Sequence, residues 1–174
     1  EFPNAHITVI NRTSLRCVEL LENGQVDLII TNHPNSYLSN FYPVKKIKKF
    51  KDIFVANESY SELKGKKVSL QELQDYPILM LDKHSTTSEF LHSIFQQEQL
   101  DLVPEIEINS NDLLIDLARI GLGIAFVPDF CLSKGMEDLF LVELEDELPA
   151  RDLALVYNNN VPLLKTTQEF LKYF

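Results

Sequence analysis

Cysteine is scarce in this chain, and long runs of apolar residues are missing. The 174 residues include two cysteines, Cys17 and Cys131, and both lie in apolar segments. A disulfide framework or a cysteine-based metal site needs more cysteines at closer spacing, so we expect two buried thiols, no metal and no cofactor. No apolar run approaches the ~18 residues that span a bilayer, and no signal peptide opens the chain. These absences predict a cytoplasmic protein without membrane contact.

Basic residues are also in deficit. The chain has 26 acidic and 16 basic residues, which gives a formal net charge of −10. Because this charge repels phosphate backbones, we expect the chain by itself not to bind DNA. The segment 44–56 is a local exception, because it contains five lysines: Lys45, Lys46, Lys48, Lys49 and Lys51. In an acidic chain, the solvated face of a strand explains them better than a nucleic-acid-binding stripe does.

Patterns of catalytic residues are absent as well. There is no Gly-x-Ser-x-Gly nucleophile elbow. Gly121 and Gly123 begin a dinucleotide-binding fingerprint, but they follow a predicted helix and precede a strand, and no third glycine follows. The four histidines show no metal-binding or glutamate-paired spacing: His6, His33, His84 and His92. We therefore assign no catalytic residue and no metal ligand.

The segment 110–128 carries a capped helix, a glycine stop and a buried strand. The Ser110 hydroxyl is a good helix N-cap, and an apolar face follows at helical spacing. Gly121 lies where helices end in the left-handed conformation that glycine adopts without strain. The apolar run Leu122–Val127 predicts a strand covered on both faces, and Pro128 ends it because proline cannot donate to a ladder. The predicted apolar helix face consists of Leu113, Leu114, Leu117 and Ala118.

Strands and helices alternate along the rest of the chain, which predicts an α/β fold. Other predicted strands are His6–Ile10, Val26–Ile30, Val44–Ala56, Ile78–Leu81, Pro104–Ile108, Leu139–Leu144 and Leu153–Tyr157. One predicted helix is capped by Ser14 and ends at Gly24. Two more begin at the capping boxes Ser69–Glu72 and Thr86–Glu89. The last two predicted helices are Asp129–Lys134 and Pro162–Tyr173. The predicted strand His6–Ile10, the helix that starts at Ser14 and the strand Val26–Ile30 together predict a βαβ unit with parallel strands and a right-handed connection.

Two motifs resemble signatures of one family. The pattern Gly-Leu-Gly-Ile-Ala-x-x-Pro at 121–128 is similar to the effector-binding domains of LysR-type transcriptional regulators, and the segment Gly24–Leu28 matches a second family pattern. The resemblance implies a two-lobe, type 2 periplasmic-binding-protein-like fold with a ligand cleft between the lobes. It implies lobe I at 1–43 and 158–174, lobe II at 57–148, and crossing strands at 44–56 and 149–157.

The resemblance also implies parts that this chain lacks. Family effector domains begin with one more strand and helix, before a segment like Phe2–Ala5, so we expect the first strand and helix of the first lobe to be absent here. From the same resemblance, we expect the N-terminal winged helix-turn-helix domain, through which the family binds DNA, to be absent from these residues too.

Hydroxyl-bearing residues at two predicted helix starts are the candidate ligand contacts. A helix N-terminus offers free N–H donors and partial positive charge, which suit carboxylates. The resemblance places two such starts across the cleft, with Ser14 and Thr86 as the first candidates; helix capping alone is the open alternative. The predicted ligand-binding residues are Arg12, Thr13, Ser14, Lys83, His84, Ser85, Thr86, Thr87, Val127 and Pro128.

The function that the resemblance implies is effector sensing. A small, anionic metabolite would bind between the lobes and control transcription through the missing DNA-binding domain. The domains would form a homodimer or tetramer, with the helices at 14–23 and 110–120 as candidate pairing elements. The alternatives are a solute-binding protein of a transporter with the same fold and, more weakly, an enzyme like prephenate dehydratase.

Overall fold

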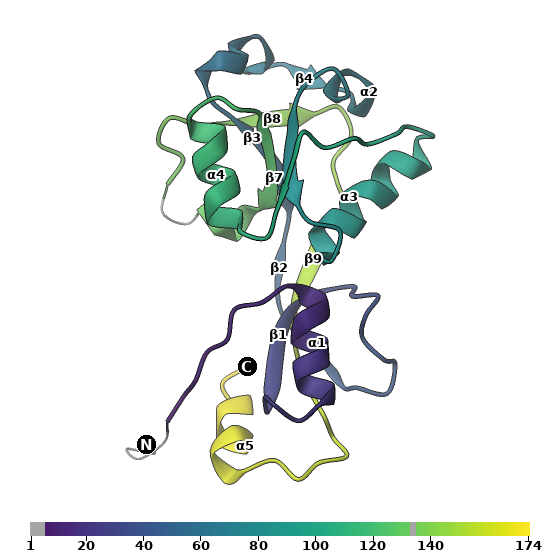
Figure 1. Cartoon of the computed structure of the whole chain (residues 1–174), viewed down its shortest axis with the longest axis vertical. Helices are drawn as coiled ribbons and strands as arrows, with labels where there is room; N and C mark the ends of the chain where they lie inside the picture. The colour runs from purple at the N-terminus through teal and green to yellow at the C-terminus, as the bar shows by residue number, and fades with distance from the viewer. Residues whose placement is uncertain (1–5, 133–134) are drawn as a thin grey trace. The chain divides into compact units, whose positions relative to one another are not determined.

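The chain divides into two compact units, and the polypeptide passes from one unit to the other twice. The computed structural model describes residues 6–132 and 135–174 (Figure 1). Unit 1 comprises Glu1–Lys49 and Asp152–Phe174, and unit 2 comprises Phe50–Arg151. In the described part of the chain, none of the helices has the length and apolar character to cross a membrane.

Unit 2 is built on a six-stranded mixed sheet. Its order is β4-β8-β3-β7-β5-β6. The three strands β7, β5 and β6 are parallel to one another, whereas β3 is antiparallel to both β7 and β8, and β4 is parallel to β8. The strands are β3 Asp52–Ala56, β4 Lys67–Val68, β5 Ile78–Leu81, β6 Ile106–Ile108, β7 Ile124–Pro128 and β8 Phe140–Leu144.

Two helices cover opposite faces of this sheet (Figure 1). Helix α3, Thr86–Gln97, connects β5 to β6, and helix α4, Asn111–Arg119, connects β6 to β7. Alternate strand side chains face each of them: Ile78 and Met80 belong to the core cluster with α3, and Leu79 belongs to the cluster with α4. The short elements of the unit are the 3-10 helices η1 Glu58–Leu63 and η2 Asp129–Leu132 and the helix α2 Leu70–Leu73.

The glycine motif has a steric explanation at both glycines. Ser110 caps α4 as predicted, because its Oγ accepts a hydrogen bond from the Leu113 N–H at 3.3 Å. Gly121 has φ of +81°, the left-handed conformation predicted after a helix. A Cβ at Gly123 would lie 2.5 Å from the Pro77 carbonyl oxygen. That carbonyl accepts the Ile124 N–H at 2.8 Å, so Gly123 lets β7 approach the start of β5.

Helix capping was predicted correctly at α4 and α2 and wrongly at α3 and α1. Ser69 and Glu72 form the expected capping box at α2. At α3 the box predicted from Thr86 does not form, because Ser85 is the N-cap and its Oγ accepts the Thr87 N–H at 3.1 Å. Helix α1, Ser14–Glu22, has Thr13 as its N-cap without a side-chain bond, so Ser14 is the first helical residue and not the cap.

Unit 1 contains a three-stranded sheet in the order β1-β9-β2. Its strands are β1 Leu28–His33, β2 Val44–Phe50 and β9 Arg151–Tyr157. Val18 and Leu21 of α1 pack against Ile29 and Val156 of this sheet, and Gly24 follows the helix with φ of +64°, as predicted. Helix α5, Lys165–Leu171, is shorter than the predicted 162–173.

The predicted strand His6–Ile10 and its βαβ unit are wrong. These five residues form no strand, and Ile7 and Val9 are 79% and 86% exposed. Strand β1 is antiparallel to β9, its one partner among the described strands. A β-branched segment becomes a strand when a neighbour accepts its hydrogen bonds and buries one face, and His6–Ile10 has neither.

Several predicted boundaries also shift. The expected single strand Val44–Ala56 is two strands in different sheets, with Lys51 between them. The Lys51 N–H donates to the carboxylate oxygen Oδ2 of Asp129, and the Lys51 carbonyl accepts the Asp129 N–H. The helix predicted at 129–134 is a 3-10 turn over Asp129–Leu132, and residues 133–134 lie outside the described residues. The segment 2–5, on which part of the resemblance depended, also lies outside them.

We predict that Gly123→Ala lowers the free energy of unfolding by about 3 kcal/mol, because the new methyl group meets a backbone carbonyl that is held in a sheet. Gly24→Ala is the control: nothing lies within 4 Å of its Cβ position, so only strain at positive φ remains, at about 1 kcal/mol. Urea unfolding of the two variants measures the difference. Equal losses would contradict the close-approach explanation.

Candidate functional site

The carboxyl ends of three parallel strands form one edge of the unit 2 sheet. Because β7, β5 and β6 are parallel and adjacent, the loops that follow them lie along the same edge. The connection through α3 runs from β5 outward to β6, and the connection through α4 runs back past β5 to β7. Ligands of open α/β sheets bind where the connections change direction in this way. The candidate site therefore lies beside the ends of β5 and β7.

Three hydrogen bonds at Asp82 hold the loop after β5. The Asp82 N–H donates to the Ile108 carbonyl at 2.9 Å, and the Asp82 carboxylate accepts the His84 N–H at 2.9 Å. The Asp82 carbonyl accepts the Ser85 N–H at 3.0 Å. These bonds place the N-cap of α3 at the sheet edge. Lys83 and His84 expose their side chains there.

The first turn of α3 is buried although it is polar. Ser85, Thr86 and Thr87 are 6%, 2% and 1% exposed. Five predicted site residues, Lys83 to Thr87, are thus brought together in one loop and helix start. The N-terminus of α3 carries partial positive charge, and its charged neighbours are Lys83 and Asp82 in the loop and Glu89 in the first turn.

A buried ion pair lies beneath this turn. Arg151 donates from Nε to Asp52 Oδ2 at 2.6 Å and from Nη2 to Asp52 Oδ1 at 2.8 Å, and both residues are buried. The same guanidinium donates to the Thr86 carbonyl at 3.0 Å and to Thr87 Oγ1 at 2.9 Å. Burial raises the pKa of the Asp52 carboxyl, and the hydrogen bonds from Arg151 oppose that shift.

Two aromatic rings enclose the guanidinium of Arg151. Its central carbon lies 5.0 Å from the centre of the Phe50 ring and 4.7 Å from that of the Phe90 ring. Cation–π contacts of this kind are strongest when the cation is desolvated. Arg151 thus joins β3, β9 and the start of α3.

The end of β7 adjoins the same ion pair. Pro128 is the cross-strand partner of Asp52 in the antiparallel ladder with β3. Val127 is fully buried, and its side chain belongs to the core cluster with α4. The structure thus brings Pro128 to the site edge and places Val127 in the core beneath it.

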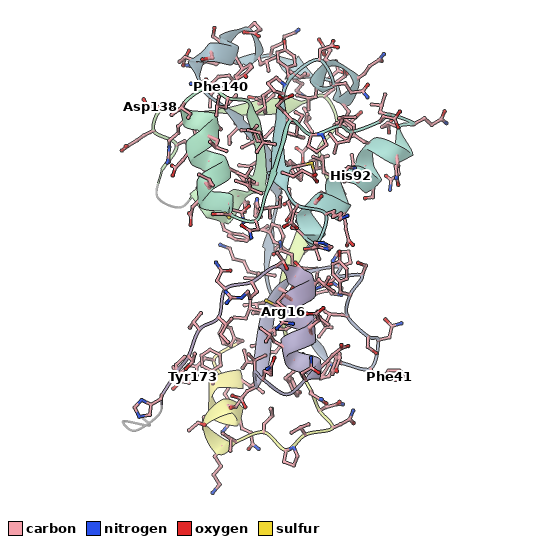
Figure 2. All side chains as sticks on the ribbon, viewed as in Figure 1. Arg16, Phe41, His92, Asp138, Phe140 and Tyr173 are labelled. Carbon is pink, nitrogen blue, oxygen red and sulfur yellow. The ribbon has the colours of Figure 1, made fainter. Side chains whose placement is uncertain are left out.

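Three predicted site residues belong to unit 1. Arg12, Thr13 and Ser14 lie at the start of α1, where the Thr13 carbonyl accepts the Cys17 N–H at 2.9 Å. Arg12 is exposed, and its guanidinium donates to the neighbouring Asn11 carbonyl. Arg16, on the same helix, has an exposed side chain and forms an ion pair with Glu19 (Figure 2).

Two buried oxygen atoms at helix starts have no hydrogen-bond partner. They are Ser88 Oγ in the first turn of α3 and Asn111 Oδ1 in the first turn of α4, and they are the two such side-chain atoms in the described part of the chain. Buried polar atoms are normally satisfied. Both unsatisfied atoms belong to helices that begin at the site edge.

The thiols and acidic side chains offer no metal site. Within residues 6–132 and 135–174, no group of three histidine, cysteine or acidic side chains is placed to hold a metal ion. Cys17 and Cys131 are free thiols in different units, and each is partly buried. Burial, with smaller contributions from Asp112, Asp52 and Asp129, raises the pKa of Cys131 to about 11.

Sequence reasoning missed Asp52 and Arg151. A signal was present for both: Asp52 is a single carboxylate between a lysine-rich stretch and the apolar run Ile53–Ala56, and Arg151 lies two residues before the apolar run that begins at Leu153. Charged residues at such positions are buried only when they are paired.

The chain matches the family model of the LysR substrate binding domain over residues 1–174. It is 24% identical to the HTH-type transcriptional activator CmpR of Synechocystis over 175 residues, 99% of this chain and 57% of that protein. It is 25% identical to a probable RuBisCO transcriptional regulator of Porphyra purpurea, over 85% of this chain and 49% of that protein. The chain spans about half the length of the curated relatives that it matches.

Solved structures share the fold. The CcmR regulatory domain of Synechocystis in complex with 2-PG has a TM-score of 0.82 and 18% identity over 92% of this chain and 77% of that chain. The effector binding domain of QuiR in complex with shikimate has a TM-score of 0.79 and 16% identity over 92% of this chain and 76% of that chain. This likeness confirms the predicted α/β, type 2 periplasmic-binding-protein-like fold.

We predict that Cys131 reacts slowly with iodoacetamide in the folded protein, because its thiol stays protonated up to about pH 11. In a Cys17→Ser variant, the alkylation rate should still rise between pH 9 and pH 11 in the native state and should level off near pH 9 in urea, where the thiol has its ordinary pKa. Mass spectrometry of quenched samples measures both rates. A native rate that levels off near pH 9 would contradict the raised pKa.

Proposed function

Because the chain belongs to the LysR substrate-binding domain family, we propose that it senses a small anionic effector for a LysR-type bacterial transcriptional regulator. Control of transcription would pass to a winged helix-turn-helix domain elsewhere in the full protein. The family is regulatory and not enzymatic, so the enzyme alternative is not retained. The solute-binding alternative is also set aside, because the matched relatives are named as transcriptional regulators.

The observation that carries the proposal is the start of α3 at the sheet edge. The N-terminus of α3, the exposed Lys83 and His84, and the buried guanidinium of Arg151 all lie at or beneath one loop. The carboxylate of Asp52 is paired with Arg151. Such a position favours an anion. The unsatisfied Ser88 Oγ supports a polar ligand at this end of the helix.

The second half of the proposed site is the start of α1. We assign lobe I to 1–43 and 158–174, lobe II to 57–148, and the crossing strands to 44–56 and 149–157. In this assignment, Arg12, Thr13 and Ser14 contribute from lobe I to an interlobe cleft. They would add a cation and two hydroxyls to those of the α3 start.

The effector class follows from the chemistry of the site and from two relatives. CcmR was solved with 2-PG and QuiR with shikimate. Hydroxyl groups and helix N–H donors suit a small carboxylate with further polar groups. We therefore propose this class and take 2-PG and shikimate as the first probes.

Self-association is part of the proposal. A homodimer or tetramer would use α1 and α4 as pairing elements, and α4 has suitable outward residues. Leu113 and Ile120, seven positions apart on α4 and its C-cap, are 47% and 70% exposed. Apolar side chains at this spacing form one stripe, which a second copy would bury.

We predict that Thr86→Val weakens effector binding about 10- to 100-fold, the loss expected for one hydrogen bond to a charged group. The probe is whichever of shikimate, 2-PG and a panel of small carboxylates raises the melting temperature of the unaltered chain, and calorimetry gives its affinity. Thr167→Val is the control, a similarly buried threonine on α5.

Two outcomes would count against this proposal. If Thr86→Val binds the probe as tightly as the unaltered chain does, then Thr86 is not a contact residue. If no small anion in the panel stabilises the chain, then the proposed ligand class is wrong.

We also predict that the chain alone has no measurable affinity for duplex DNA at physiological salt, because its net charge is −10. Fluorescence anisotropy with a labelled duplex, repeated at low salt, measures this. Tight binding that weakens steeply with salt would show that the lysines of β2 form a DNA-binding face.

A further inference from the structure

Arg151 holds the first turn of α3 from a distant part of the chain. The residues that it contacts there, Thr86 and Thr87, are 65 and 64 positions away in sequence. Its other two bonds reach Asp52, 99 positions away at the start of β3. All four bonds come from one buried, planar group, so the position of the turn is tied to two strands at once.

The stability of the fold does not by itself explain this arrangement. Moving two charges out of water costs several kcal/mol per ion, and well-packed apolar residues often replace a buried ion pair without loss of stability. Apolar side chains cannot fix the orientation of the groups around them, because they form no hydrogen bonds. An arginine fork fixes angles as well as distances, because its donors lie in one plane.

Arg151 bonds to two residues of α3, Thr86 and Thr87, which are both candidate ligand-binding residues. The Thr86 carbonyl belongs to the first helical residue, and the Thr87 N–H donates the capping bond to Ser85 Oγ. Arg151 therefore restrains the backbone at Thr86 and the side chain of the next residue, Thr87. The Phe90 ring, one turn further along α3, lies against the same guanidinium.

Arg151 also lies at a boundary in the chain. It is the last residue of unit 2 and the first residue of β9. Its neighbour Asp152 belongs to unit 1 and forms an ion pair with Lys46 of β2 at 2.6 Å.

We propose that Arg151 is a positioning residue of the effector site, which orients Thr86 for the ligand and ties the α3 turn to β9. The restraint of the α3 turn by Arg151 does not depend on a ligand. Its effect on affinity rests on the function proposed above. Arg151 need not touch the effector.

The test removes both charges together. Arg151→Met alone would leave Asp52 buried without a partner, so the main variant is the double substitution Asp52→Val with Arg151→Met. Arg119→Met is the matched control, because Arg119 lies in the same unit and its ion pair with Asp116 is on the surface. If the double variant does not fold, Arg151→Lys replaces it: one ammonium group can pair with Asp52 but cannot serve four acceptor positions.

The first measurement is amide hydrogen exchange without ligand. In the double variant, exchange at residues 84–90 should rise about tenfold or more, whereas exchange in β7 should stay as in the unaltered chain, since local opening differs from global unfolding. The control should change neither. Unchanged exchange at 84–90, or a rise that β7 shares in full, would overturn the proposal.

The second measurement is the affinity for the probe that stabilises the unaltered chain. We expect the double variant to bind it about tenfold more weakly at a similar urea midpoint. Equal affinity would overturn the role of Arg151 in the site and leave the proposed function intact. If neither shikimate nor 2-PG nor another panel anion binds the unaltered chain, the proposed function fails, and the exchange result alone decides the role of Arg151.

Discussion

The buried pairing of Arg151 with Asp52 is the contact on which the candidate site depends. It lies at the point where β3 begins, where β9 begins and where α3 starts, and its donors satisfy groups in all three. A charged group with low exposure has to be paired on every side, because no water replaces a missing partner. That requirement restricts the α3 turn to one position relative to the sheet.

The sheet order explains why a site forms at this edge. Three adjacent parallel strands bring their following loops together, and connections that run in opposite directions place α3 and α4 on opposite faces. The start of α3 then lies beside the end of β7, where Pro128 pairs with Asp52. Backbone donors need no particular side chain, so in the proposed site the topology would supply the preference for an anion, and the hydroxyl and cationic residues would add selectivity.

Much of unit 2 could be predicted from the sequence, and unit 1 much less. The helix of 111–119, its Ser110 cap and the strand that ends at Pro128 were predicted because each depends on residues within one turn. The cap of α3 was misplaced by one residue, since Ser85 and Thr86 have equivalent hydroxyls and the choice depends on where the chain bends at Asp82. His6–Ile10 has the composition of a strand, but no neighbouring strand in the described part of the chain pairs with it. Composition alone does not show whether a neighbouring strand is available.

Local chemistry by itself determined the class of this chain. The order helix, Gly121, Gly123, strand and Pro128 resembled the pattern of the family. The positive φ of Gly121 follows from the end of the helix, whereas the need for glycine at 123 comes from the Pro77 carbonyl beside it. The tertiary structure alone decided that Asp52 meets Arg151 and that their contact secures Thr86 and Thr87. Residues 99 positions apart meet only after the sheet has set its strand order, and no local pattern encodes that distance.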